Sequence, residues 1–393
     1  MLTGCDSIRS HFPHKKYIKP PKTNRSLNVA VLLPLSGYHH NLGKNILDGI
    51  NLALLELKIT DINCEIIDIG STTEESKKIF DNIDLDKFQV LLGPVFKEDT
   101  IMIYEKARKK KLVIISYSND MTLVGLPGLY LLDVICLQQV NEIFNYAMKQ
   151  QGFKIYSIVS RNDYGDAIKA KLVDNRSKSF FNLKQMVECA HSKKLPLRPI
   201  SLSQAILSIK EAIKQGTYNN SGATSFYPTP TILVPEEGKS LINILNQLQF
   251  LYSVSDKYYK VLGVGDWRNY YLTQNLVVKN AWIADIPHKS LYKFESRFKN
   301  QYGYVPIRLA AIAYDSIFLL SKIVYKTGNG VIIKLKEIEK QSGYQGVTGK
   351  FRLESSGVNR RLFSIFEYRN GIMQEISVAP RKFAQAKILR DYQ

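Results

Sequence analysis

The sequence has few of the residues that cross-link or metallate small proteins. Of 393 residues, 4 are cysteine and 6 are histidine. Cys5, Cys64, Cys136 and Cys189 form no CxxC pair, and the histidines form no HExxH motif. This spacing excludes a disulfide scaffold and matches no zinc or redox site, so no metal ligand is assigned. The last three cysteines lie in or near apolar stretches, and we interpret them as buried thiols.

Long apolar runs and the common catalytic motifs are also missing. No uninterrupted apolar run reaches the about 18 residues that a membrane-spanning helix needs. The chain has no GxSxG motif, no Walker loop and no GxGxxG after a strand. Gly263-Val264-Gly265-Asp266 begins like a dinucleotide loop but lacks the third glycine. We therefore assign no catalytic residue and no cofactor, and predict a protein that is not an enzyme.

Positive charge is abundant. Lys and Arg number 54 against 35 Asp and Glu, which gives a formal net charge of +19. Such an excess attracts anionic partners, although lysines spread over solvated faces are the simpler explanation. No zinc finger, RNP motif or basic zipper accompanies the basic run 108–111, so no nucleic-acid partner is expected. The length predicts two or three domains, each with its own core.

The N-terminus resembles a bacterial lipobox. Leu2-Thr3-Gly4 precedes Cys5, the expected lipidation site, and a polar, basic stretch follows. A signal peptide needs basic and apolar segments that Met1 alone does not supply, so we expect the natural precursor to begin upstream. Residues 1–26 are interpreted as a lipobox remnant and flexible basic tether. The expected location is the bacterial periplasm, anchored by lipid to the inner or outer membrane; Asp6 resembles an inner-membrane retention signal.

From Leu27 onward, strand and helix patterns alternate. The apolar, β-branched run 28–34 is typical of a buried parallel strand, and 42–57 has apolar residues at helical spacing. Further strands are expected at 64–69, 88–92, 112–116, 129–132, 154–159, 230–234 and 260–263, and helices at 73–80, 101–109, 140–150, 166–173, 201–214 and 240–250. Repeated βα units predict an α/β fold with mostly parallel sheets, whose ligands lie beyond the carboxyl ends of the strands.

The strand-end loops resemble those of the type I periplasmic binding proteins, the leucine-binding-protein-like family. The resemblance rests on 29–37, 43–53, 91–94, 163–165 and 314–316 in that order. Within that family, 118–120, 347–353, 357 and 366–371 are similar to penicillin-binding protein activator lipoproteins. The resemblance implies two Rossmann-like lobes, a cleft between them and three hinge crossings, placed near Asp133, Ile286 and Lys334.

The implied division is as follows. Lobe 1 comprises 27–133 plus 287–334, lobe 2 comprises 134–286 plus 335–376, and 377–393 form a C-terminal tail. Two lobes on such a hinge can close on a ligand or stay open.

The resemblance also implies where a ligand would bind. The family holds an α-carboxylate with first-lobe hydroxyls and backbone N–H groups, and an ammonium with a second-lobe acid or aromatic residue. In this sequence, bulky and charged residues replace the small hydroxyl residues that the family has after Pro94. Glu237, like Glu236, is a possible acid for contact with the ammonium. Each candidate also has a structural explanation: a turn, a surface lysine or a helix start. The cleft candidates are Ser36, Phe96, Lys97, Thr100, Tyr117, Ser118, Tyr164, Glu236 and Asp266.

Two functions remain open. The first is a non-catalytic envelope lipoprotein that regulates peptidoglycan synthesis by binding a penicillin-binding protein. The alternative is the substrate-binding protein of an ABC transporter for an amino acid or another small molecule. The expected partners are accordingly a penicillin-binding protein or an ABC permease, a small-molecule ligand in the cleft, and a membrane through the lipid anchor. A receptor needs a polar, convergent cleft, whereas an activator needs an exposed, partly apolar patch.

Overall fold

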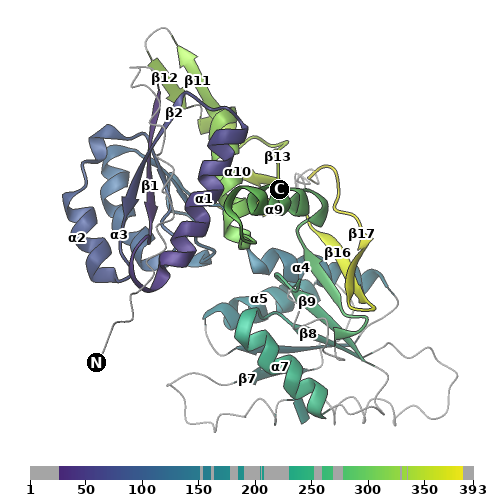
Figure 1. Ribbon diagram of the computed structural model, residues 1–393. Coiled ribbons are helices and arrows are strands. Elements are labelled where there is room, and N and C mark those ends of the chain that lie inside the picture. Colours follow the sequence, from purple (N-terminus) through teal and green to yellow (C-terminus); the bar gives the residue numbers. More distant parts are fainter. Residues whose placement is uncertain are drawn as a thin grey trace, which may run out of the picture.

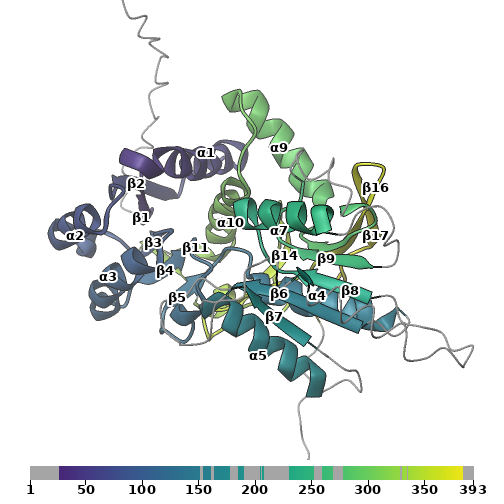
Figure 2. The same cartoon turned by 90° about the horizontal axis from the view of Figure 1, so that it is seen from below.

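The protein has two lobes, each built around one β-sheet (Figure 1). The computed structural model describes residues 26–150, 154–160, 163–177, 185–189, 204, 206–207, 230–251, 259–268, 278–327, 330–333 and 335–383. Figure 2, seen from below, shows α1, α2 and α3 in one lobe and α4, α5 and α7 in the other.

The first sheet has five parallel strands in the order β2-β1-β3-β4-β5. They are β1 (Leu27–Leu33), β2 (Ile62–Asp68), β3 (Val90–Leu92), β4 (Val113–Ser116) and β5 (Leu129–Leu131). Side chains of β1 alternate between two apolar clusters, with Val29 and Val31 in one and Ala30 and Leu32 in the other. The strand is therefore buried on both faces, as its continuous apolar sequence predicts.

Helices cover both faces of this sheet. One face packs against α1 (His40–Glu56), α9 (His288–Tyr302) and α10 (Arg308–Ile323). The other packs against α2 (Thr73–Asn82) and α3 (Lys97–Ala107). Helix α2 begins with a capping box in which Thr72 and Glu75 each accept the other's backbone N–H. Single 3-10 turns lie at Gly37–His39, Leu85–Lys87, Arg108–Lys110 and Met121–Leu123.

The second sheet has the order β17-β16-β10-β9-β8-β6-β7. Its parallel strands are β6 (Lys154–Ser160), β7 (Gln185–Cys189), β8 (Pro230–Val234), β9 (Lys260–Val264) and β10 (Trp282–Asp285). The antiparallel hairpin β16 (Ser364–Arg369) and β17 (Ile372–Ser377) extends it. One face packs against α7 (Gly238–Leu251), the other against α4 (Cys136–Lys149) and α5 (Asp163–Ser177). Read from the β7 edge, the parallel strands of this sheet have the order β7-β6-β8-β9-β10, which corresponds strand for strand to β2-β1-β3-β4-β5 of the first sheet. This shared order confirms the expected pair of Rossmann-like lobes.

The chain crosses between the lobes after β5 and again after β10. After α10 follow β11 (Val324–Thr327), β12 (Gly330–Ile333), α11 (Leu335–Ile338), β13 (Tyr344–Gly346), β14 (Gly349–Leu353) and β15 (Asn359–Arg361). Ile338, Tyr344 and Phe351 belong to the first-lobe core. Lys334, the expected third crossing, lies outside the described residues. On this packing we propose that the third crossing lies between β15 and β16.

Several described elements, among them β7, β10 and α9, were not expected from the sequence. Those that were expected overlap described elements. The expected helix 201–214 is the exception, because the structure describes only 204 and 206–207 of it. Among the described residues, no helix is both long and apolar enough to span a membrane. Past β17, the carbonyl of Arg381 accepts a hydrogen bond from Lys350 of β14 at 3.0 Å. The described part of the predicted tail therefore contacts the β13–β15 sheet.

Candidate functional site

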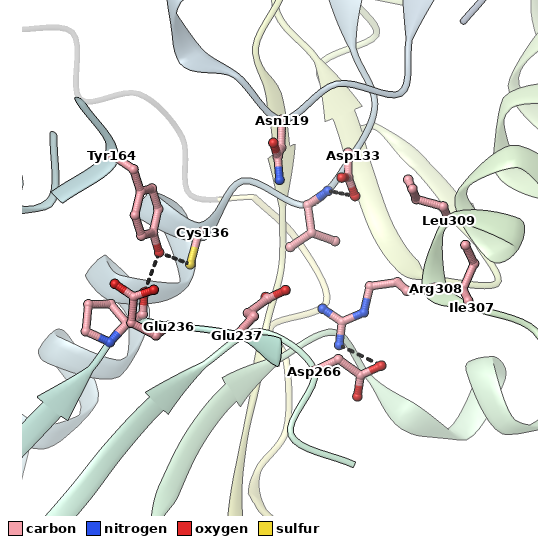
Figure 3. A pocket seen from close by; sticks show the side chains of 12 residues that line it. Asn119, Asp133, Cys136, Tyr164, Glu236, Glu237, Asp266, Ile307, Arg308 and Leu309 are labelled. Atoms are coloured by element: carbon pink, nitrogen blue, oxygen red, sulfur yellow. Dashed lines mark hydrogen bonds and ion pairs between the residues drawn. The ribbon is translucent and has the colours of Figure 1, made fainter. Parts of the chain in front are cut away.

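A cavity of about 450 Å³ lies between the two lobes. The second lobe contributes loops at the carboxyl ends of β8 and β9 and the first turn of α5, while the first lobe contributes the loop after β4 and the N-terminus of α10 (Figure 3). The first crossing, between β5 and α4, runs past the cavity. The lining residues are Asn119, Asp133, Val134, Cys136, Tyr164, Pro235, Glu236, Glu237, Asp266, Ile307, Arg308 and Leu309. Loops beyond parallel strands are where ligands of open α/β sheets bind.

One wall is fixed by Tyr164, at the start of α5. Its hydroxyl donates to the carbonyl of Pro235 at 2.6 Å and lies 2.8 Å from the sulfur of Cys136. Burial raises the pKa of the Cys136 thiol and of the Tyr164 hydroxyl, with the neighbouring Glu236 and Glu237 adding to both shifts. Both groups therefore stay protonated near neutral pH, and Cys136 is a poor nucleophile.

The cavity is rich in carboxyl groups. Figure 3 shows Glu236 on the Tyr164 side, Asp266 near Arg308, and Glu237 between them. Glu237 is exposed to the open cavity. Loss of hydration still raises its pKa to about 7, and the charges of Asp133 and other carboxylates contribute to this shift. Burial raises the pKa of Asp133 to about 6, against the opposing effect of its hydrogen bond from the Val134 N–H. The charges of Arg361 and Arg308 also lower the pKa of Asp133, so burial alone raises it, whereas neighbouring carboxylates add to the shift of Glu237 and Arg308 opposes it.

Arg308, the first residue of α10, is held by two carboxylates. Its guanidinium lies 2.8 Å from Asp285 at the end of β10 and 3.6 Å from Asp266 after β9. Burial would raise the pKa of Asp266, but the guanidinium groups of Arg308 and Arg268 hold it well below its usual range. Arg268 also contacts Glu295 of α9 at 2.6 Å. A row of alternating charges therefore connects first-lobe helices with second-lobe loops.

Three of the nine candidates from the sequence line the cavity: Tyr164, Glu236 and Asp266. The other six do not. The Ser36 carbonyl accepts a hydrogen bond from the Ser71 hydroxyl. The ring of Phe96 packs on His39 with centroids 4.6 Å apart, and Lys97 forms a salt bridge of 3.5 Å with Asp120.

The remaining three candidates use their hydroxyls within the first lobe. Thr100 donates to the Phe96 carbonyl at 2.7 Å and lies 3.1 Å from the Ser116 hydroxyl. The buried hydroxyl of Tyr117 lies 3.0 Å from that of Ser316. The Ser118 hydroxyl accepts the Asp120 N–H at 3.2 Å. These side chains position the first-lobe loops rather than lining the cavity.

Several lining residues were not among the candidates. Asn119 lies within the 118–120 segment noted in the sequence, and Asp133 was identified only as a crossing point. Arg308 has no strand-end signal because it enters the cavity from a helix N-terminus. Cys136 was interpreted as a buried thiol; it is half-buried against the cavity, whereas Cys64 is buried. No set of His, Cys, Asp and Glu side chains suited to a metal ion occurs among the residues that the structure describes.

The comparisons with known proteins show the fold. No protein-family model matches the chain. An uncharacterised protein of Rickettsia prowazekii is 29% identical over 125 residues, which are 32% of this chain and 33% of that protein. The match thus spans about a third of the length of this curated relative.

Solved structures match over most of the chain. A Rhodospirillum rubrum protein assigned to a branched-chain amino acid ABC transporter is 14% identical, with a TM-score of 0.72, over 89% of this chain and 100% of that one. The leucine-binding protein LivK of Thermotoga maritima is 16% identical, with a TM-score of 0.59, over 90% and 98%. LpoA of Haemophilus influenzae is 15% identical, with a TM-score of 0.61, over 90% of this chain and 59% of its own.

These likenesses establish that the chain has the type I periplasmic binding protein fold, as the sequence predicted. Its structural neighbours include both amino-acid-binding proteins and LpoA.

Proposed function

We propose that this chain is a non-catalytic binding protein of the bacterial envelope and that it holds a small molecule in the inter-lobe cavity. One observation carries the proposal: a cavity of about 450 Å³ with convergent polar groups lies at the carboxyl ends of strands from both lobes. Ligand pockets of proteins usually measure about 300–1,000 Å³ and lie at such positions. The function that fits this geometry is the substrate-binding protein of an ABC transporter, which delivers its ligand to a permease.

Thermal unfolding of the full chain against amino acids, short peptides and peptidoglycan fragments tests this function. A ligand at about 100 times its dissociation constant stabilises the folded state by about 2.7 kcal/mol, which raises the melting temperature by roughly 5 °C or more. Tyr164→Ala, which removes a cavity wall, should abolish the shift. Tyr38→Ala is the matched control, because Tyr38 is 92% exposed and lies outside the cavity. A flat response to the whole panel would contradict the receptor function.

A second function has its own supporting observation. The fold is similar to LpoA, a penicillin-binding protein activator, over 90% of this chain. In this alternative the protein regulates peptidoglycan synthesis by binding a penicillin-binding protein. The test is the polymerisation rate of a purified penicillin-binding protein of the same bacterium with and without the full chain. An unchanged rate at saturating concentrations would refute it.

The proposal also includes the anchor and the cellular location. Cys5 is proposed as the lipidation site and residues 1–26 as a tether, on the strength of the lipobox-like residues; the tether up to residue 25 lies outside the described residues. Structural neighbours named as ABC substrate-binding proteins support a place in the bacterial periplasm. Labelling of the chain with a fatty-acid probe in its bacterium tests the anchor.

A further inference from the structure

We propose that the ligand of the inter-lobe cavity is an organic cation, an alkyl amine or diamine. The ligand itself needs no carboxylate group in order to bind. This inference rests on the proposed role of the cavity as a ligand site and specifies what that site selects. The chemistry that carries it is the balance of charges around the cavity.

The cavity is acidic although the chain as a whole is basic. Four carboxylates and one guanidinium line it, whereas the whole chain has a net charge of +19. Arg308 and Asp266 are already committed, because Arg308 pairs with Asp285 at 2.8 Å and Asp266 with Arg268 at 2.6 Å. Among the described residues, Glu237 and Asp133 form no salt bridge; Arg308 acts on both only at longer range, as does Arg361 on Asp133. The cavity therefore lacks a cation rather than an anion.

The environment of these two carboxyl groups supports the same conclusion. Loss of hydration raises the pKa of Glu237 to about 7 and burial raises that of Asp133 to about 6, so both carboxyl groups are partly protonated near neutral pH. A bound ammonium would favour the ionised forms and so would compete with protons. The Tyr164 ring lines the same cavity and offers a surface on which a cation can rest.

A carboxylate finds no comparable partner. The hydroxyls of Thr100 and Tyr117 are used within the first lobe, and that of Ser118 does not line the cavity. The amide of Asn119 lines the cavity and can donate to a carboxylate, but it carries no charge. The N-terminus of α10 favours anions, but its Arg308 is neutralised by two flanking carboxylates. The ammonium of a zwitterionic amino acid would therefore contribute favourably to its binding free energy, whereas its carboxylate would contribute unfavourably. Val134, Pro235, Ile307 and Leu309 supply apolar lining for an aliphatic chain.

Isothermal titration of the full chain with a matched series tests the inference. Leucine is compared with 3-methylbutylamine, which lacks only the carboxylate, and with 4-methylpentanoate, which lacks only the amine; putrescine and agmatine extend the cationic set. We expect an amine to bind at least tenfold more tightly than leucine, and 4-methylpentanoate to give no signal. Affinity for the amine should rise on the order of tenfold between pH 5.5 and pH 7.5, as Glu237 and Asp133 ionise.

Two variants locate the effect. Glu237→Gln should weaken amine binding at least tenfold, whereas Glu65→Gln, an exposed position on β2 outside the cavity, should leave it unchanged. If Glu237→Gln impairs folding, Asp133→Asn replaces it with the same expectation.

The outcomes separate this inference from the function on which it rests. If leucine or 4-methylpentanoate binds as tightly as the amine, the cation inference is overturned but the cavity remains a ligand site. The same conclusion follows if Glu237→Gln leaves amine binding unchanged. If no member of the series and no compound of the thermal-shift panel binds, the proposed receptor function fails as well.

Discussion

Replacing Asp133 with asparagine should stabilise the protein at high pH. The pKa of this carboxyl group is raised by burial from 3.8 to about 6, so the folded state binds more protons than the unfolded state between these values. Stability contributed by this group is therefore present at about pH 4 and is lost as pH rises through 6. At 1.36 kcal/mol for each pKa unit, the loss is about 3 kcal/mol at pH 8.

The variant Asp133→Asn lacks this titration and can still accept the N–H of Val134, which lies 2.6 Å from the Asp133 carboxylate. It should match the parent at pH 4 and exceed its free energy of unfolding by about 3 kcal/mol at pH 8. For lobes of this size, that corresponds to roughly 6–12 °C in melting temperature. Thermal unfolding of both proteins from pH 4 to pH 8 measures the difference, and all other titrating groups cancel in the comparison.

Asp86→Asn is the matched control, because the Asp86 side chain is 69% exposed in a surface ion pair. Such pairs contribute less than about 1 kcal/mol, so the control should follow the parent at every pH. A variant at Asp133 that is less stable than the parent at pH 8 would show that Arg361 and Arg308 stabilise the ionised carboxylate. The reasoning about uncompensated negative charge in the cavity would then fail too.

Three further predictions concern other parts of the chain. Tyr117→Phe removes a buried hydrogen bond and should lower the unfolding free energy by about 1–2 kcal/mol in denaturant titration without changing ligand affinity; lost affinity at full stability would contradict it. Gly49→Ala places a methyl group against the Ala310 carbonyl and should lower the unfolding free energy in the same titration by about 1–3 kcal/mol. Leu55→Ala, at a position 61% exposed on the same helix, should change it by no more than about 0.5 kcal/mol. Equal stability of the two variants would refute the packing argument. Cys5→Ala in the full-length precursor should abolish labelling by a fatty-acid probe, and equal labelling of parent and variant would disprove the anchor.

The fold could be predicted because each parallel strand carries its own signal. The continuous apolar sequence of β1 reflects burial on both faces of a sheet, and helical spacing in 42–57 reflects one buried face of α1. Boundaries were less certain where neighbouring residues are chemically alike. Thr72 caps α2 by accepting the Glu75 N–H, and the sequence alone does not distinguish it from the adjacent Thr73.

The site could be predicted only in its second lobe. Tyr164, Glu236 and Asp266 follow strands, so the rule that ligands lie beyond carboxyl ends applies to them. The same rule selects Tyr117, but nothing in the local sequence shows that its hydroxyl contacts a serine 199 positions later. Arg308 depends on tertiary structure in the same way, because its carboxylate partners lie after β9 and at the end of β10.

The interleaved connections also set the order in which the chain can fold. The core of the first lobe contains Leu27, from the first strand, together with Phe351 and Phe363, from near the end of the chain. That core cannot close until almost the whole chain has been synthesised, and contacts so distant in sequence form slowly. A slow-folding chain remains extended for longer after synthesis, which would help the passage across a membrane that the proposed envelope location requires.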